Sequence, residues 1–153
     1  MEKQENSSIK NRVLVVDDDP GIRELLKFKL ISQGYEAMTA KDANEFQAMA
    51  MNNEFNLIIL DIWLKGKFGT DVYCDLLEAG LDRKIPVVFV SALVEDFPPS
   101  HVREGHQYAV YGKPIDLGKL MSDIHLLLDS QPNQGSKKNR GTNGKHSASE
   151  MLD

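Results

Sequence analysis

The 153-residue sequence lacks three features that would assign a protein to a class at once. Its single cysteine, Cys74, excludes an internal disulfide, which fits a reducing compartment and predicts a cytoplasmic protein. No apolar run approaches the roughly 20 residues that span a bilayer, and the polar opening MEKQENSSIKNR lacks the apolar segment of a signal peptide. No metal-ligand spacing links the histidines, which we expect at the surface: His101, His106, His125 and His146.

An excess of positive charge is also absent, since 18 Lys and Arg face 23 Asp and Glu and the net charge is -5. This acidity argues against direct nucleic-acid binding by the main body. Residues 130–153 have no aromatic side chain and many Ser, Asn, Gly and Lys, so they bury too little surface to offset the entropy of ordering. We therefore expect a flexible segment over residues 1–11, one domain over residues 12–129, and a disordered tail or linker over residues 130–153.

Five short apolar runs are present in the expected domain. Continuous runs of this length are typical of strands that are buried on both faces of a parallel sheet. Any one run alone could be part of a buried helix, but their regular spacing favours strands for the set. The runs are Val13–Val16, Tyr35–Thr39, Leu57–Leu60, Val87–Val90 and Tyr108–Tyr111.

Amphipathic helix patterns alternate with these runs. The first helix is expected to start at Pro20, with Asp19 as its N-cap, and to end at Gly34. Further helices are expected over residues 42–52, 69–79 and 117–128, and a short one near residues 95–105, where two prolines and a glycine interrupt the pattern. The expected inner faces are Ile22, Leu25, Leu26 and Leu30; Ala43, Phe46, Ala50 and Met51; Val72, Leu76 and Leu77; and Leu120, Ile124, Leu127 and Leu128. Five strand–helix units predict an α/β fold with a doubly wound parallel sheet and helices on both faces.

Polar residues follow these strands at the ends where such sheets bind ligands. The first strand is followed by three aspartates, the third by Asp61, the fourth by Ser91, and the fifth leads to Lys113. Carboxylates at close range repel one another unless a cation lies among them, and oxygen ligands suit Mg²⁺ or Mn²⁺. A lysine and a hydroxyl can bind phosphoryl oxygens. The pattern indicates metal-assisted phosphoryl transfer onto or through an aspartate.

Four fragments, taken in order, resemble the receiver domain of response regulators in two-component signal transduction. They are VVDDD, LIILD, VFVSA and GKP, and the resemblance extends from Arg12 to Asp129. It implies a flavodoxin-like (βα)5 fold with five helices and strand order 2-1-3-4-5. It also implies a phosphoacceptor signalling domain that catalyses only its own phosphorylation and slow dephosphorylation.

The resemblance also implies a role for each residue at the strand ends. Asp61 would be the phosphoacceptor, Asp18 would bind Mg²⁺ directly, and Asp17 would bind it largely through water. Asp61 and the backbone carbonyl of Trp63 would complete the metal ligands. Asp19 is better explained as a helix cap than as a ligand.

The later strands would supply the groups that contact the phosphoryl oxygens. Ser91 would donate a hydrogen bond, and Lys113 would form an ion pair and precede a cis peptide bond to Pro114. The implied phosphoryl donor is a sensor histidine kinase or a histidine phosphotransfer protein. The resemblance leaves the output protein unknown and suggests a homodimer through the face of the fourth helix, fifth strand and fifth helix.

The sequence departs from the family pattern in the loop DIWLKGKFG, residues 61–69. Lys65 replaces a common proline and Phe68 replaces a second aspartate, so we expect a more basic and more mobile loop. Val110 occupies the position of the family's aromatic switch residue, and we expect both Tyr108 and Tyr111 to point to the other face of the sheet.

The residues expected to flank the phosphoryl group are also unusual, because Trp63 and Leu93 are apolar and cannot orient an attacking water. This predicts slow hydrolysis of the phosphorylated form.

Two alternatives remain open at this point. A haloacid-dehalogenase-type phosphatase would use Asp17 as nucleophile and Asp19 as general acid, but it would leave Asp61 without a role. A degenerate receiver would serve only as a protein-binding module. The complete set of aspartates, serine and lysine argues against the second alternative.

Overall fold

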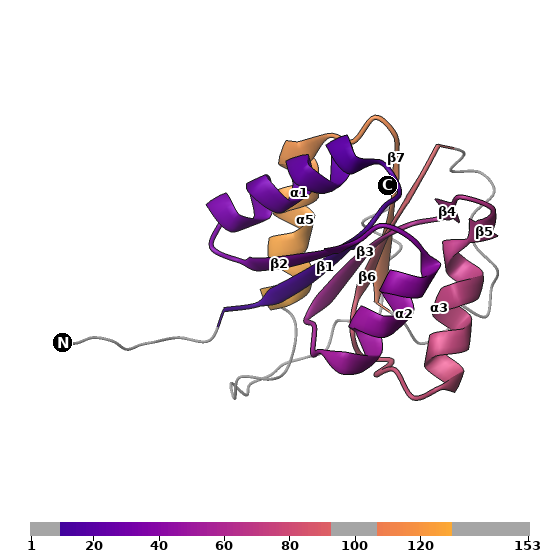
Figure 1. Cartoon of the computed structure of the whole chain (residues 1–153). Coiled ribbons are helices and arrows are strands. Elements are labelled where there is room, and N and C mark those ends of the chain that lie inside the picture. The colour runs from indigo at the N-terminus through magenta and orange to yellow at the C-terminus, as the bar shows by residue number, and fades with distance from the viewer. Residues whose placement is uncertain (1–9, 93–106, 130–153) are drawn as a thin grey trace.

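The computed structural model describes residues 10–92 and 107–129, which contain a five-stranded parallel sheet (Figure 1). Its order is β2-β1-β3-β6-β7, which is the predicted order 2-1-3-4-5 for the five long strands. The strands are β1 (Arg12–Val16), β2 (Glu36–Ala40), β3 (Leu57–Asp61), β6 (Val87–Ser91) and β7 (Tyr108–Gly112).

Helices cover both faces of the sheet, as predicted. Figure 1 shows α1 (Pro20–Ser32) and α5 (Leu117–Asp129) on one face, and α2 (Ala43–Asn52) and α3 (Gly69–Glu78) on the other. Alternate residues of each strand enter one of two apolar cores. Val13 and Val15 pack toward α1 and α5, whereas Leu14 packs toward α2 and α3. The predicted fourth helix, near residues 95–105, lies outside the described residues.

The predicted ends of α1 are confirmed by its caps. The Asp19 carboxylate accepts a hydrogen bond from the Gly21 backbone N–H at 2.8 Å, and Pro20 occupies the first turn. At the other end, Gly34 has a φ of +95°, a left-handed conformation that favours glycine. None of the helices in the described residues is long and apolar enough to cross a membrane.

Two predicted inner-face residues are wrong. Leu25 is 50% exposed and Met51 is 46% exposed, whereas their neighbours Leu26 and Ala50 are buried. Successive residues of a helix lie 100° apart, so only one of two adjacent residues can sit at the centre of a narrow apolar stripe.

The expectation for the tyrosines of β7 is half wrong. Tyr108 packs into the α2/α3 core on the same side as Val110, and only Tyr111 packs toward α5. Residues two apart in a strand share a face, so the prediction for Tyr108 misapplied the alternation. His125 is not a free surface residue either, because it is half-buried and its Nδ1 hydrogen-bonds the Tyr35 hydroxyl.

The loop after β3 folds into a small antiparallel hairpin of β4 (Trp63–Leu64) and β5 (Lys67–Phe68). Lys65 and Gly66 form its turn with φ values of +39° and +89°, as a tight two-residue hairpin requires. Leu64, which is 1% exposed, anchors the hairpin in the α2/α3 core. Sequence analysis did not predict this hairpin, which is held against the domain by the buried side chain of Leu64.

Candidate functional site

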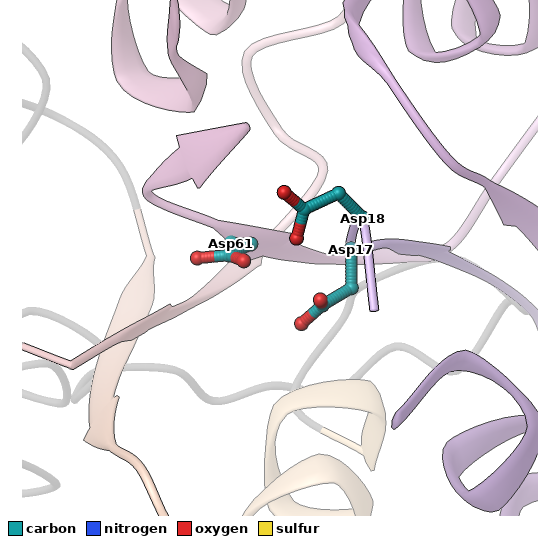
Figure 2. Close-up of side chains that lie close together, drawn as sticks. All are labelled: Asp17, Asp18 and Asp61. Carbon is teal, nitrogen blue, oxygen red and sulfur yellow. The ribbon is translucent and has the colours of Figure 1, made fainter. Parts of the chain in front are cut away.

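Three carboxylates meet at the carboxyl edge of the sheet because β1 and β3 are neighbours in register. Val16 pairs with Leu60, so Asp17 and Asp61 each follow at the next position, and Asp18 comes after Asp17. Each aspartate offers one carboxylate oxygen within 4.8 Å of the other two (Figure 2). Asp17 is 3% exposed and Asp61 is 5% exposed. The structure therefore brings together Asp17, Asp18 and Asp61, the acidic residues that sequence analysis predicted to form one site.

Lys113 reaches the same cluster from the end of β7. Its Nζ lies 3.2 Å from Asp17 Oδ2 and 3.1 Å from Asp61 Oδ2. The Lys113 backbone N–H donates to the Ser91 carbonyl at 3.1 Å, and the Lys113–Pro114 peptide bond is cis, as the resemblance implied. Ser91 is 7% exposed and ends β6 one residue beyond Val90, the register partner of Asp61.

The charges of this cluster suit a divalent cation. Asp17, Asp18 and Asp61 with Lys113 carry a net charge of about -2 when all four are ionised, and their ligand atoms toward a cation are oxygens, as Mg²⁺ prefers. Asp18 is half-buried, and within the described residues no hydrogen bond or ion pair occupies its carboxylate. Asp18 is therefore the carboxylate most available as a direct metal ligand.

The protonation of Asp61 reflects this crowding. Burial and the charge of Asp17 raise the pKa of Asp61 to about 6, although Lys113 and the Trp63 N–H act in the opposite direction. Burial lowers the pKa of Lys113, but the charges of Asp61 and Asp17 outweigh it and raise that pKa overall. Near neutral pH, Asp61 is thus mainly a carboxylate and Lys113 is an ammonium group.

The β4–β5 hairpin fixes the backbone beside Asp61. The Trp63 N–H donates to Asp61 Oδ1 at 3.1 Å, and the Gly69 N–H donates to the Ile62 carbonyl at 2.6 Å. Hydrogen-bonded and non-hydrogen-bonded pairs alternate in an antiparallel ladder, which makes Trp63 and Phe68 a non-hydrogen-bonded pair. The Trp63 carbonyl therefore points out of the ladder, as a metal-binding carbonyl must.

Two supporting residues were not assigned by sequence reasoning. The Arg23 Nη1 donates to the Asp17 carbonyl at 2.9 Å and fixes the backbone at the start of the acidic cluster. A Cβ at Gly69 would lie 2.2 Å from the Asp61 carbonyl oxygen, so only glycine fits there. The retention of Gly69 in the loop pattern could have indicated its close contact with the Asp61 carbonyl. No local sequence pattern indicated the role of Arg23.

Asp19 has a different role from its two neighbours. Its carboxylate caps α1, and its own backbone N–H donates to Asp17 Oδ1 at 2.9 Å. A carboxylate that caps a helix accepts hydrogen bonds from backbone N–H groups, so it is poorly placed to donate a proton as a general acid. This geometry opposes the phosphatase alternative, which required Asp19 to protonate a leaving group.

These features define the class of protein. The sequence model of the response regulator receiver domain family matches residues 13–125, and the chain belongs to this family. It is a receiver domain of the two-component response-regulator type, with the CheY-like fold that its solved neighbours share.

Particular relatives agree with this assignment. The chain is 30% identical over 119 residues to the DNA-binding dual master transcriptional regulator RpaA of Synechocystis sp., covering 76% of this chain and 48% of that protein. It is 31% identical over 116 residues to response regulator RR06 of Streptococcus pneumoniae, covering 76% and 52%. The chain spans about half the length of the curated relatives it matches.

One solved relative is matched over almost its whole length. It is the response regulator protein TrrA from Thermotoga maritima, in a crystal structure in complex with Mg(2+)-BeF. The two structures superpose with a TM-score of 0.65 and 30% sequence identity, covering 77% of this chain and 99% of that one.

Proposed function

We propose that this receiver domain accepts a phosphoryl group on Asp61 from a phosphohistidine of a sensor histidine kinase or a histidine phosphotransfer protein. Asp17, Asp18, Asp61 and the Trp63 carbonyl would hold one Mg²⁺, which supplies charge neutralisation at the phosphoryl oxygens when bound. One observation carries the proposal. The buried Asp61 carboxylate lies within 4.8 Å of two further carboxylates and 3.1 Å from the Lys113 ammonium.

The chemical step follows from the protonation of the site. An ionised Asp61 oxygen forms a bond to phosphorus while the bond between phosphorus and the donor nitrogen breaks. The electron pair of that bond stays on the imidazole, which takes up a proton, and an aspartyl phosphate remains. Lys113 pairs with the phosphoryl oxygens as the charge of Asp61 passes onto them, and Ser91 donates a hydrogen bond from the end of β6.

The remaining features of the chain belong to the same proposal. The receiver domain would extend over residues 12–129, whereas the flexible start expected over residues 1–11 and the tail or linker expected over residues 130–153 lie almost entirely outside the described residues. The domain acts in the cytoplasm and signals by changing conformation, without catalysing a reaction on another molecule. The apolar side chain of Trp63 does not orient water, so we propose that the phosphorylated form hydrolyses slowly.

The test is labelling by acetyl phosphate in the presence of Mg²⁺. We expect intact-mass spectrometry to show one added phosphoryl group on the wild-type chain and none on Asp61→Asn. Peptide mapping should place the group on Asp61. A label on Asp17 would instead support the phosphatase alternative, and normal labelling of Asp61→Asn would refute the proposal.

The degenerate-receiver alternative predicts a different response to a phosphoryl mimic. Beryllofluoride with Mg²⁺ should change the fluorescence of Trp63 in an active receiver, because Trp63 lies two residues from the acceptor. An unchanged spectrum together with no acetyl phosphate labelling would favour the degenerate receiver.

A further inference from the structure

Arg23 brings a positive charge to a position that electrostatics disfavours. It is the fourth residue of α1, which starts at Pro20, and the N-terminal end of a helix dipole repels a cation. Within residues 10–92 and 107–129 it forms no ion pair with any carboxylate of the acidic cluster. Its Nη1 instead donates a hydrogen bond to the backbone carbonyl of Asp17 at 2.9 Å. Neutralisation of the acidic cluster therefore does not account for the placement of Arg23.

The Asp17 carbonyl needs a donor from outside the sheet. The parallel pairing of β1 with β2 ends at Val16 and Ala40, and the Asp17 N–H still donates to the Ala40 carbonyl at 3.1 Å. Because β2 ends at Ala40, no further residue of that strand can donate to the Asp17 carbonyl. A polar group in a buried site is costly when it lacks a partner, and Arg23 supplies the partner from α1.

The same hydrogen bond completes a set of contacts that fixes the acidic segment. The Asp19 N–H donates to Asp17 Oδ1 at 2.9 Å, and the Arg23 N–H donates to the Asp19 carbonyl at 3.0 Å. Asp18 lies between these two fixed residues, with its carboxylate beside those of Asp17 and Asp61 (Figure 2). The position of the Asp18 oxygens therefore depends on a backbone segment that the Arg23 side chain holds in place.

The identity of the cation determines how much this position matters. Mg²⁺ requires a near-octahedral set of oxygens at about 2.0–2.1 Å, whereas the larger Ca²⁺ accepts about six to eight oxygens in a flexible arrangement. Groups that hold metal ligands in place typically contribute about 10–100-fold to metal affinity. A small shift of the backbone from Asp17 to Asp19 should therefore weaken the binding of Mg²⁺ much more than the binding of Ca²⁺.

We propose that Arg23 is a positioning residue for the divalent cation. Its hydrogen bond to the Asp17 carbonyl holds Asp17 and Asp18 in the arrangement that Mg²⁺ requires, and so gives the site a preference for Mg²⁺ over Ca²⁺. This inference rests on the proposed function, because it concerns the cation of the same site. The effect is opposite in sign to that of the Arg23 charge, which by itself repels a cation.

Two variants of the same helix separate position from charge. Arg23→Met removes the hydrogen-bond donor and the charge, but keeps a long side chain that favours a helix. Lys27→Met makes the same change of charge one turn, or about 5.4 Å, further along α1, where Lys27 is half-buried and forms no ion pair within the described residues. Charge alone predicts tighter Mg²⁺ binding in both variants, whereas positioning predicts weaker binding in Arg23→Met only.

The experiment measures the affinities of the full chain for Mg²⁺ and for Ca²⁺, with the fluorescence of Trp63, the only tryptophan, as the signal. We expect the Mg²⁺ affinity of Arg23→Met to fall at least about tenfold and its Ca²⁺ affinity to fall less than about threefold. Both affinities of Lys27→Met should stay within about twofold of the wild type.

Urea unfolding in EDTA establishes that each variant is folded, since a purely structural role would lower the stability of Arg23→Met without changing the ratio of its two affinities. If Arg23→Met does not fold, Arg23→Lys takes its place. Lysine keeps the charge but has a shorter side chain without the planar guanidinium fork, so it must shift the ratio in the same direction.

The other outcomes contradict the positioning role. Equal or tighter Mg²⁺ binding by Arg23→Met would overturn it, as would an equal loss for both ions or the same loss in Lys27→Met. A wild-type chain that binds neither ion would overturn it as well.

Labelling by acetyl phosphate, measured in parallel, keeps this role distinct from the proposed function. If Asp61 is labelled and Arg23→Met retains the wild-type preference for Mg²⁺, the positioning role fails and the proposed function stands. If the preference shifts as expected and Asp61 of the wild type is not labelled, Arg23 positions a cation and the proposed function fails.

Discussion

At the residue scale, three consecutive aspartates have three different roles. Asp17 is buried and contacts Lys113, Asp19 caps α1, and Asp18 lies between them at the cluster with a carboxylate that no described contact occupies. Sequence reasoning separated Asp19 from the other two because an Asp-Pro pair is typical of a helix start.

This division predicts how two conservative variants differ in Mg²⁺ binding. Asp18→Asn removes the charge of the proposed direct ligand and should weaken Mg²⁺ binding at least about tenfold. Asp19→Asn should change the affinity by less than about twofold, because asparagine caps a helix as well as aspartate does. The fluorescence of Trp63, the only tryptophan in the chain, provides the titration signal. Equal weakening in both variants would show that Asp19 is also a ligand.

A second prediction at this scale concerns stability without metal. The folded state raises the pKa of Asp61 to about 6 from the ordinary value of 3.8, so the folded state binds the proton more tightly than the unfolded chain does. The ionised carboxylate therefore lowers the free energy of unfolding above pH 6, on the order of 3 kcal/mol, and this loss is recovered as the pH falls toward the unfolded pKa.

Asp61→Asn should accordingly be more stable than the wild type near neutral pH in the presence of EDTA. Urea unfolding at neutral pH and at about pH 4 measures the effect, and the difference between the two proteins should shrink at the lower pH. Saturating Mg²⁺ should stabilise the wild type and not the variant. A variant that is less stable at neutral pH would contradict this account of the site.

At the element scale, the sequence was enough to predict the regular strands and helices but not the specific packing contacts between them. The five strands were predicted because continuous apolar runs have one simple explanation in an α/β protein. The β4–β5 hairpin was missed because its turn is Lys-Gly, which is a weaker signal than Asn-Gly, and because its strands have two residues each. The hydrogen bond from Arg23 to the Asp17 carbonyl could not be predicted from the sequence, because it depends on the direction of the Arg23 side chain in the folded protein.

The close approach at the hairpin base gives a prediction about glycine. In Gly69→Ala, the new Cβ would lie 2.2 Å from the Asp61 carbonyl oxygen, so the backbone at the acceptor must shift. We expect a loss of stability of about 2 kcal/mol or more and slower labelling by acetyl phosphate. Gly118→Ala is the matched control, because its Cβ would be 3.7 Å from the nearest atom and alanine favours α5. Urea unfolding should place the two variants on opposite sides of the wild type.

The family resemblance implied an aromatic switch residue at the position of Val110, and the structure shows what surrounds that position. Tyr108 shares the face of Val110 and packs edge to face on Phe89, with ring centroids 6.3 Å apart. Tyr111, on the other face, donates a hydrogen bond to the buried Asp123 of α5. Position 110 is a valine and both tyrosines of β7 are packed into the cores, so the aromatic switch residue implied by the resemblance has no counterpart within β7.

At the scale of the whole molecule, charge is distributed unevenly along the chain. The chain carries -5 in total and residues 130–153 carry +2, so residues 1–129 carry -7. The phosphate backbone of DNA repels such a body at any distance within the Debye length. A relative of about twice the length is named as a DNA-binding regulator, but the acidity of residues 1–129 opposes DNA binding by this part of the chain.

The expected result is therefore negligible DNA binding by residues 1–129 even at low salt. Fluorescence anisotropy with a labelled duplex of random sequence measures it, and the full chain serves as the comparison. The full chain should bind slightly more at low salt, because the basic residues of its last segment are restored, and this excess should disappear at physiological ionic strength. Salt-resistant binding by residues 1–129 would mean that a local positive surface outweighs the net charge of the domain.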